Sequence, residues 1–387
     1  MKTLFVNSGM LGHRAVAELI RDAAGAMPSV AACHIDLSRD LTLGDRAIRR
    51  LLGVGLAPTQ GPAANLDLRR WRLELNAGLL AARRIAEAER ATGPFDALHF
   101  HTQATAYASI ARMKRTPTIV SIDATQRLAS REMTSALARL SYQPNIVHDR
   151  AVFDAAAAIV STSDWTARDL ADAYPECAGK VHVMPYPVRA RGDASWIDER
   201  RERARDRQHR VRVLFMGGDF PRKGGFELLS AWRDGSFADR ASLDLVTDWP
   251  IAAADLPAGV RVIPHVTPYS AAWLELWRSA DLFVMPTRRE AFGMVFQEAA
   301  AAGLPVVATR INAVPEIVQD GRTGLLVQPN DAGALIRAMS ALVESPDLRA
   351  AMGERSRRRV LSISSPERYA AGLAHLLDSV VHAHASI

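Results

Sequence analysis

The stretch from residue 281 to residue 309 constrains the fold of this chain more than any other. An apolar run at 282–285 predicts a buried strand, and an Ala-rich run at 294–302 predicts a helix that a Gly-Leu-Pro sequence ends. A second apolar run follows at 306–308. Buried strands that alternate with helices over short links are typical of a parallel sheet with both faces covered.

The same alternation continues along most of the 387 residues. Further strands are predicted at 2–7, 31–37, 95–101, 117–123, 158–163, 181–186, 211–216, 243–247 and 260–266. We therefore predict an α/β protein, and we expect two domains because the chain is longer than one hydrophobic core usually serves. The expected first domain is 1–190 with a returning helix at 366–387, the second is 211–365, and a charged linker joins them at 191–210.

Two carboxylates bracket the turn that opens the helix at 294. Glu290 lies in the loop and Glu298 lies about one helical turn inside, with Phe292 and Gly293 between them. A helix that begins near Gly293 directs unpaired N–H groups outward, where a diphosphate binds well. Glu298 would then reach a ribose, and Glu290 would lie beside a sugar ring. The residues alone leave another interpretation open, in which Glu290 is a solvated loop residue and Glu298 a surface charge.

The sequence EAFGMVFQEAAAAGLPVVAT, residues 290–309, resembles the signature of retaining glycosyltransferases of family 4. The resemblance is strong from 211 to 361 and looser before, and it implies the GT-B fold, two Rossmann-like domains facing across a cleft. It also implies that Glu290 lies by the transferred sugar and that Glu298 binds the nucleotide ribose. The intervening segment that would hold phosphate and sugar comprises Ala291, Phe292, Gly293, Met294 and Val295.

A second phosphate-binding loop is predicted after the first strand of the second domain. Gly217 and Gly218 follow that strand, and Arg222 and Lys223 precede another pair of glycines. Cations beside glycines between a strand and a helix suit a phosphate chain. The resemblance assigns Lys223 to the leaving diphosphate; the family's arginine position is Gly218 here, and Arg222 is expected to supply that charge. The resemblance also implies that Val266 lies at the position where the family contacts the nucleotide base.

The strand at 95–101 ends in His99 and His101, which alternation places on one face. A metal site at this pair is weakly supported, because no Cys, Asp or Glu stands close by in sequence. Strand carboxyl ends face the ligand crevice, and the resemblance likewise places His101 at the reaction centre. His99 is also open to interpretation as a packed histidine. The resemblance implies that Gly12 closes over the donor. Its loop lacks the fingerprint that an NAD-dependent dehydrogenase needs.

The amino-acid composition indicates in which cellular compartment the protein works. Cys33 and Cys177 are the only cysteines, so neither a disulfide framework nor a zinc-type Cys pair is predicted, and a cytoplasmic location fits. No secretory signal is expected at the N-terminus, and no uncharged apolar run reaches the ~18 residues of a membrane span.

The net charge of +6 is unevenly placed, since residues 44–115 hold 12 Lys and Arg against 6 Asp and Glu. Arg69, Arg70 and Arg72 surround Trp71, a combination that suits peripheral contact with an anionic membrane at its inner face. A solvated helix face explains the same charges equally well. Nucleic acid is not an expected partner, because the basic run near residue 200 is interleaved with Asp and Glu.

These features predict an enzyme that transfers a sugar from a UDP- or GDP-sugar to an acceptor hydroxyl with retention of configuration. The expected acceptor is a glycan or a lipid-linked molecule, in polysaccharide, glycolipid or other glycoconjugate biosynthesis. No metal or other cofactor is expected, because Lys223, Arg222 and the helix N-terminus at Gly293 can stabilise the leaving diphosphate. The alternative is a non-catalytic module that binds nucleotide sugars.

Overall fold

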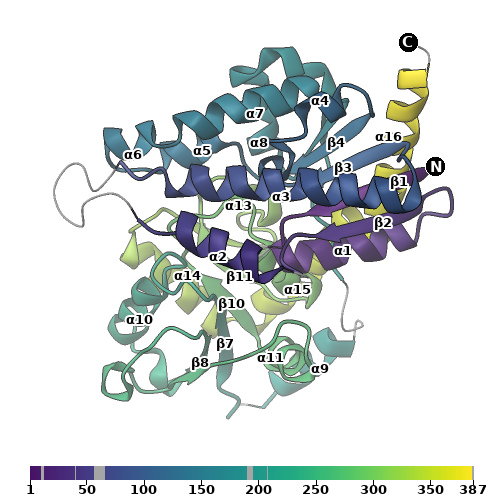
Figure 1. The fold of residues 1–387 in the computed structure, drawn as a ribbon. Coiled ribbons are helices and arrows are strands. Elements are labelled where there is room, and N and C mark those ends of the chain that lie inside the picture. Colours follow the sequence, from purple (N-terminus) through teal and green to yellow (C-terminus); the bar gives the residue numbers. More distant parts are fainter. Residues whose placement is uncertain (10–12, 40, 56–65, 190–194, 207, 386–387) are drawn as a thin grey trace. The chain divides into compact units, whose positions relative to one another are not determined.

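A computed structural model describes residues 1–9, 13–39, 41–55, 66–189, 195–206 and 208–385 (Figure 1). The chain divides into two compact units, Met1–Pro187 with Pro366–Ile387, and Val188–Ser365. Each unit contains one six-stranded sheet, and every strand pairing in both sheets is parallel. The predicted α/β class is therefore confirmed.

The first sheet has the strand order β2-β1-β3-β4-β5-β6. Its strands are β1 (Lys2–Asn7), β2 (Ala31–Asp36), β3 (Ala97–His101), β4 (Thr118–Ile122), β5 (Ala158–Ser161) and β6 (Val181–Val183). The register sets Asn7 opposite His101 and His101 opposite Ser121, so the ends of three strands share one edge. Loops that follow these strands leave the sheet at that edge, where parallel sheets bind ligands.

The helices of the first unit are α1 (His13–Gly25), α2 (Leu43–Leu52), α3 (Arg69–Thr92), α4 (Ile110–Met113), α5 (Gln126–Arg131), α6 (Ala136–Leu140), α7 (Gln143–Ala155), α8 (Asp164–Ala173) and α16 (Pro366–Ala385), with 3-10 turns η2 (Gln103–Ala106) and η3 (Pro175–Lys180). Between β4 and β5 the chain forms three separate helices, α5, α6 and α7, in place of one continuous helix. Thr125 and Ser135 each cap a new helix with their side chains, which explains the breaks. Helix α16, yellow in Figure 1, contacts α1.

The second sheet has the order β12-β11-β10-β7-β8-β9. Its strands are β7 (Val211–Met216), β8 (Ala241–Val246), β9 (Val260–Ile263), β10 (Leu282–Met285), β11 (Val306–Thr309) and β12 (Gly324–Val327). Its helices are α9 (Ser195–Arg203), α10 (Gly225–Asp234), α11 (Ala271–Ser279), α12 (Met294–Ala301), α13 (Val314–Ile317), α14 (Ala332–Glu344) and α15 (Pro346–Ser364), with η4 (Phe237–Asp239) and η5 (Ala253–Asp255). Strand β7 pairs with β10, so the loops that follow these two strands leave the sheet side by side.

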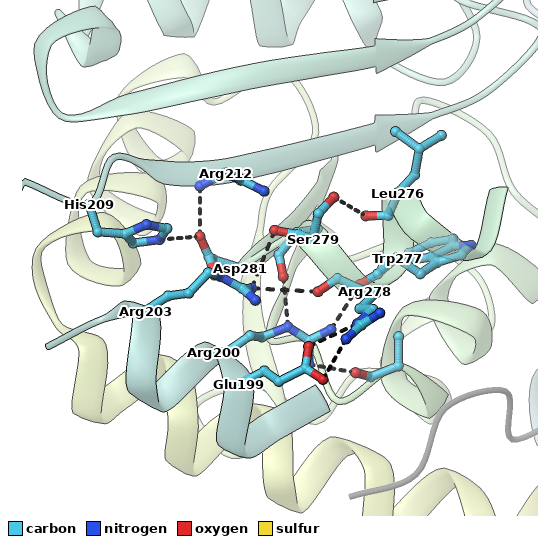
Figure 2. A network of polar contacts seen from close by, with 12 residues as sticks. Glu199, Arg200, Arg203, His209, Arg212, Leu276, Trp277, Arg278, Ser279 and Asp281 are labelled. Carbon is cyan, nitrogen blue, oxygen red and sulfur yellow. Dashed lines mark hydrogen bonds and ion pairs between the residues drawn. The ribbon is translucent and has the colours of Figure 1, made fainter. Parts of the chain in front are cut away.

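The segment 191–210, predicted as a charged linker, belongs to the second unit where the structure describes it. Helix α9 packs on the second unit, and Ile197 on its inner side is buried. The Arg200 guanidinium donates to three backbone carbonyls, those of Ala280 at 2.7 Å, Ala302 at 2.7 Å and Trp277 at 2.8 Å (Figure 2). The alternating charges that suggested solvent exposure instead fix this helix to the sheet.

Asp281 lies at the centre of the same network (Figure 2). Its carboxylate accepts from the backbone N–H of Arg212 at 2.9 Å, contacts the His209 imidazole at 2.8 Å and pairs with Arg203 at 3.2 Å. Burial by itself would raise the pKa of Asp281, but the hydrogen bonds from His209 and Arg212 and the Arg203 charge hold that pKa below its ordinary value. The network joins helix α9 to the starts of β7 and β10.

Replacement of Arg200 by alanine is expected to destabilise the second unit. The change leaves three carbonyls without their charged donor, and we expect a loss of about 2–4 kcal/mol in the free energy of unfolding. The matched control is Arg201→Ala, because Arg201 is exposed and pairs only with surface carboxylates, a type of contact worth about 0–1 kcal/mol. Urea unfolding followed by tryptophan fluorescence measures both. Equal losses in the two variants would contradict this role of Arg200.

Candidate active site

The candidate site is built on the two loops that leave β7 and β10. Gly224, in the first loop, has φ +80°, and a Cβ atom there would lie 2.0 Å from the carbonyl oxygen of Pro286 in the second loop. Only glycine permits this approach. The Arg288 backbone N–H also donates to the Arg222 carbonyl at 2.9 Å. The loops are therefore held together by backbone contacts before any side chain contributes.

The side chains predicted for catalysis in the second unit meet between these loops. The Lys223 ammonium group pairs with the Glu290 carboxylate. Arg222 pairs with Asp219 at 2.8 Å and donates to the carbonyl of Arg289 at 2.8 Å, so its guanidinium bridges the two loops. Both predicted cations thus lie near Glu290, and each is neutralised by a carboxylate of the protein.

Helix α12 begins at the predicted position. Its N-cap is Gly293 with φ +91°, and no side chain caps the first turn. Phe292 is buried, whereas Ala291, Met294 and Val295 are half-buried around the helix start. An uncapped first turn leaves backbone N–H groups and the positive end of the helix dipole available to an anion. The segment 291–295 therefore has the local structure that phosphate binding requires.

The two glycines after β7 differ in their surroundings. A Cβ atom at Gly217 would lie 2.9 Å from the Cγ atom of Lys223, whereas one at Gly218 would meet no atom within 4 Å. Gly217 thus lets the Lys223 side chain pass close to the backbone. Gly218 is exposed, in the position where the resembling family carries an arginine.

Glu298 lies on α12 one turn beyond the helix start and is half-buried. Its Oε1 atom accepts a hydrogen bond from the Tyr269 hydroxyl at 3.1 Å. Burial raises the pKa of Glu298 to about 7, against the lowering effect of the Tyr269 hydrogen bond. The carboxyl group therefore changes its charge close to neutral pH.

Val266, predicted near the base, is half-buried in the loop between β9 and α11. Two residues of this loop, His265 with φ +59° and Tyr269 with φ +65°, have left-handed backbones. His265 is exposed and its Nδ1 atom lies 3.1 Å from the Asp248 carboxylate. The same loop therefore carries both Val266 and Tyr269, the residue that contacts Glu298.

In the first unit, His101 lies at the end of β3. Its Nε2 atom lies 2.8 Å from the Tyr186 hydroxyl, and burial raises the Tyr186 pKa, so this hydroxyl stays protonated at neutral pH. His99 is packed in the core, 2.8 Å from the Ser121 hydroxyl, and burial lowers its pKa to about 3. His99 is thus a neutral structural residue. Gly12, predicted to close over the donor, lies outside the described residues.

The basic turn that opens α3 makes contacts within its own unit. Arg70 pairs with Glu74 at 2.9 Å, and Arg72 donates to the Val54 carbonyl at 2.7 Å. Trp71 is half-buried. None of the described helices is long and apolar enough to cross a membrane. In the described residues no group of three or more His, Cys, Asp or Glu side chains gathers where it could hold a metal ion.

Sequence reasoning missed three residues of this site. Tyr269 follows a strand-like segment with no motif around it, and Gly224 is one of many loop glycines. Asn312, at a position where the resembling family has glycine, donates from its side-chain amide to the Glu290 carbonyl at 3.0 Å. Asn312 has φ +45°, a backbone conformation that asparagine tolerates better than most residues. That tolerance was the one signal in the sequence that could have identified it.

Nucleotide binding is expected to strengthen as the pH rises from 6 to 8. The Glu298 pKa of about 7 means that its carboxylate forms across this range, and an ionised carboxylate accepts a stronger hydrogen bond from a hydroxyl. Isothermal titration with UDP and GDP at pH 6, 7 and 8 measures the change. Glu298→Gln is the control, because the diphosphate titrates alike in both proteins. Identical pH profiles for the two would exclude Glu298 as the cause.

Two families match the chain, one over each half. The family described as "Glycosyltransferase Family 4" matches residues 23–191, and "Glycosyl transferases group 1" matches residues 197–359. The D-inositol 3-phosphate glycosyltransferase of Streptomyces scabiei is 39% identical over 108 residues, 28% of this chain and 24% of that protein. The protein of the same name from Salinispora arenicola is 27% identical over 323 residues, 77% of this chain and 72% of its own. The match to the first relative thus spans only 24% of its length.

Solved structures share the fold over almost the whole chain. Sucrose-phosphate synthase from Thermosynechococcus elongatus has a TM-score of 0.72 at 17% identity, covering 99% of this chain and 100% of that one. Anabaena HepE, solved in complex with UDP, has a TM-score of 0.69 at 18% identity, covering 98% and 100%. At this identity the likeness shows the fold, which is GT-B, as predicted.

Proposed function

The chain belongs to the family 4 type of glycosyltransferases, and from this premise we propose that it transfers a sugar from a nucleotide diphosphate sugar to an acceptor hydroxyl. The proposal includes retention of the anomeric configuration and independence of a metal ion. The observation that carries it is the meeting of Lys223, Glu290 and the uncapped start of α12 between two adjoining loops.

The arrangement suits the charges that develop when a glycosidic bond to a diphosphate breaks. Negative charge accumulates on the departing diphosphate while positive charge develops on the sugar. The Lys223 ammonium group, the Arg222 guanidinium and the N–H groups of α12 would stabilise the first charge. Glu290 would face the second, because it pairs with Lys223 and its side chain lies close to Gly293 at the helix start.

A UDP- or GDP-sugar is the proposed donor. Support comes from HepE, a structural neighbour that has been solved with UDP and with UDP-glucose. Glu298, one turn inside α12, would bind the ribose hydroxyls, and Val266 would lie at the base. The proposed acceptor is a glycan or a lipid-linked molecule in polysaccharide, glycolipid or other glycoconjugate biosynthesis, with His101 of the first unit on the acceptor side.

Release of nucleoside diphosphate from a panel of UDP- and GDP-sugars tests the proposal, with NMR of the anomeric proton to follow configuration. We expect slow hydrolysis of one donor without acceptor, retained configuration, and the same rate in excess EDTA. A protein that binds a donor but releases no diphosphate from it, with or without candidate acceptors, would be the non-catalytic alternative. Inverted configuration or loss of activity in EDTA would contradict the retaining, metal-independent mechanism.

Replacement of Lys223 by alanine is expected to lower turnover more than donor affinity. The diphosphate gains charge toward the transition state, so an ammonium group there stabilises the transition state more than the bound substrate. Steady-state kinetics with the identified donor measure both quantities. The matched control is Arg288→Ala, which removes a neighbouring cation that pairs with Glu227 instead. A change confined to the Michaelis constant would make Lys223 a ground-state binding residue.

Contact with an anionic membrane remains a proposal for the acceptor side, and it predicts salt-sensitive binding to vesicles. Attraction between Arg69, Arg70 and Arg72 and anionic head groups is screened within ~8 Å at physiological ionic strength. Co-sedimentation with anionic and neutral vesicles at low salt measures it, with all three arginines changed to serine as the comparison. Equal sedimentation with both lipids, or no loss of binding in the triple variant, would exclude the membrane contact. An acceptor that is not in a membrane would then be the better proposal.

A further inference from the structure

The carboxylate proposed to bind ribose accepts a hydrogen bond from within the protein. The Tyr269 hydroxyl donates to Glu298 Oε1 at 3.1 Å. The cavity that these two residues line together with Trp273 and Arg189 has a volume of about 10 Å³. A space of that size holds one water molecule at most. In this arrangement the cavity has no room for a ribose.

Tyr269 is held in its position by its neighbours and not by its own backbone preference. Its φ of +65° is unfavourable for a residue with a large side chain. The ring packs on Trp273 with centroids 4.9 Å apart, and the Arg189 guanidinium lies 5.5 Å from the ring centroid. Strained backbones persist where surrounding contacts determine them, and they occur often at ligand clamps. Release of the hydroxyl from Glu298 would remove one of the contacts that hold this conformation.

We propose that Tyr269 limits the nucleotide affinity of this site, because its hydroxyl donates to Glu298 Oε1 and competes there with a ribose hydroxyl. The inference rests on the proposed function. Both hydroxyls are neutral donors, so a ribose hydroxyl that takes the place of Tyr269 replaces one hydrogen bond by another of the same kind. A nucleotide therefore gains less from Glu298 than it would from an unoccupied carboxylate.

The opposite role for Tyr269 makes the opposite prediction. If the hydroxyl orients the Glu298 carboxylate for ribose, both hydrogen bonds exist together in the complex. Loss of the hydroxyl would then weaken nucleotide binding. The small cavity leaves no room for a ribose on the side of Glu298 that faces Tyr269 and Trp273, which favours displacement.

The test is Tyr269→Phe, which keeps the ring and its packing but removes the hydroxyl. Isothermal titration with UDP and with GDP at pH 8 should show binding on the order of tenfold tighter than in the wild-type protein. Tyr142→Phe is the matched control, because that tyrosine hydroxyl contacts Arg70 of the first unit, and its affinity should not change.

A double variant shows whether the effect passes through Glu298. In the Glu298→Gln background, Tyr269→Phe should change nucleotide affinity by less than about twofold, since the carboxylate for which the two hydroxyls compete is gone. Unchanged or weaker binding by Tyr269→Phe alone would overturn the inference, as would equal tightening in both backgrounds. If wild-type protein binds a diphosphate and the variant binds it no more tightly, only this inference fails. If neither protein binds UDP or GDP, the proposed function fails with it.

Discussion

The close approach of two backbones, after β7 and after β10, is the constraint on which the candidate site depends. Parallel pairing of these strands sends both loops out at the same edge of the sheet. Gly224 then lets one loop lie against the Pro286 carbonyl of the other, a contact that any side chain would prevent. That contact brings the two loops close enough for Lys223 on one to pair with Glu290 on the other. The geometry of the site thus depends on Gly224, a residue without a functional group.

Each charged group named in the site has a partner within the protein. Lys223 pairs with Glu290, Arg222 with Asp219, and Glu298 accepts from Tyr269. A donor would therefore bind by exchanging partners, with phosphate oxygens competing for Lys223 and ribose hydroxyls competing with Tyr269. Such an exchange limits the affinity gained from each contact, because the free groups are not left unsatisfied.

The sequence predicted those parts of the structure that depend on local pattern. Apolar runs and glycines located β7, β10 and the start of α12 to the residue, because burial and helix termination act within a few positions. The attachment of helix α9 to the second unit was missed, since alternating charge marks solvent exposure in most chains, whereas Arg200 here donates to three carbonyls from distant segments. Tyr269 was missed for the same reason. Its contact with Glu298 joins residues far apart in sequence, and no local signal encodes such a pair.

Hydrogen–deuterium exchange with UDP and GDP measures most directly whether these loops form the donor site. The account predicts that the nucleotide protects three segments of the second unit together, 217–225, 264–270 and 290–299, and that protection is lost from all three in Lys223→Ala combined with Glu298→Gln. Protection of these segments would place the diphosphate and ribose on the residues named here. Protection confined to other parts of the chain, in a protein that still releases diphosphate from a nucleotide sugar, would contradict the account.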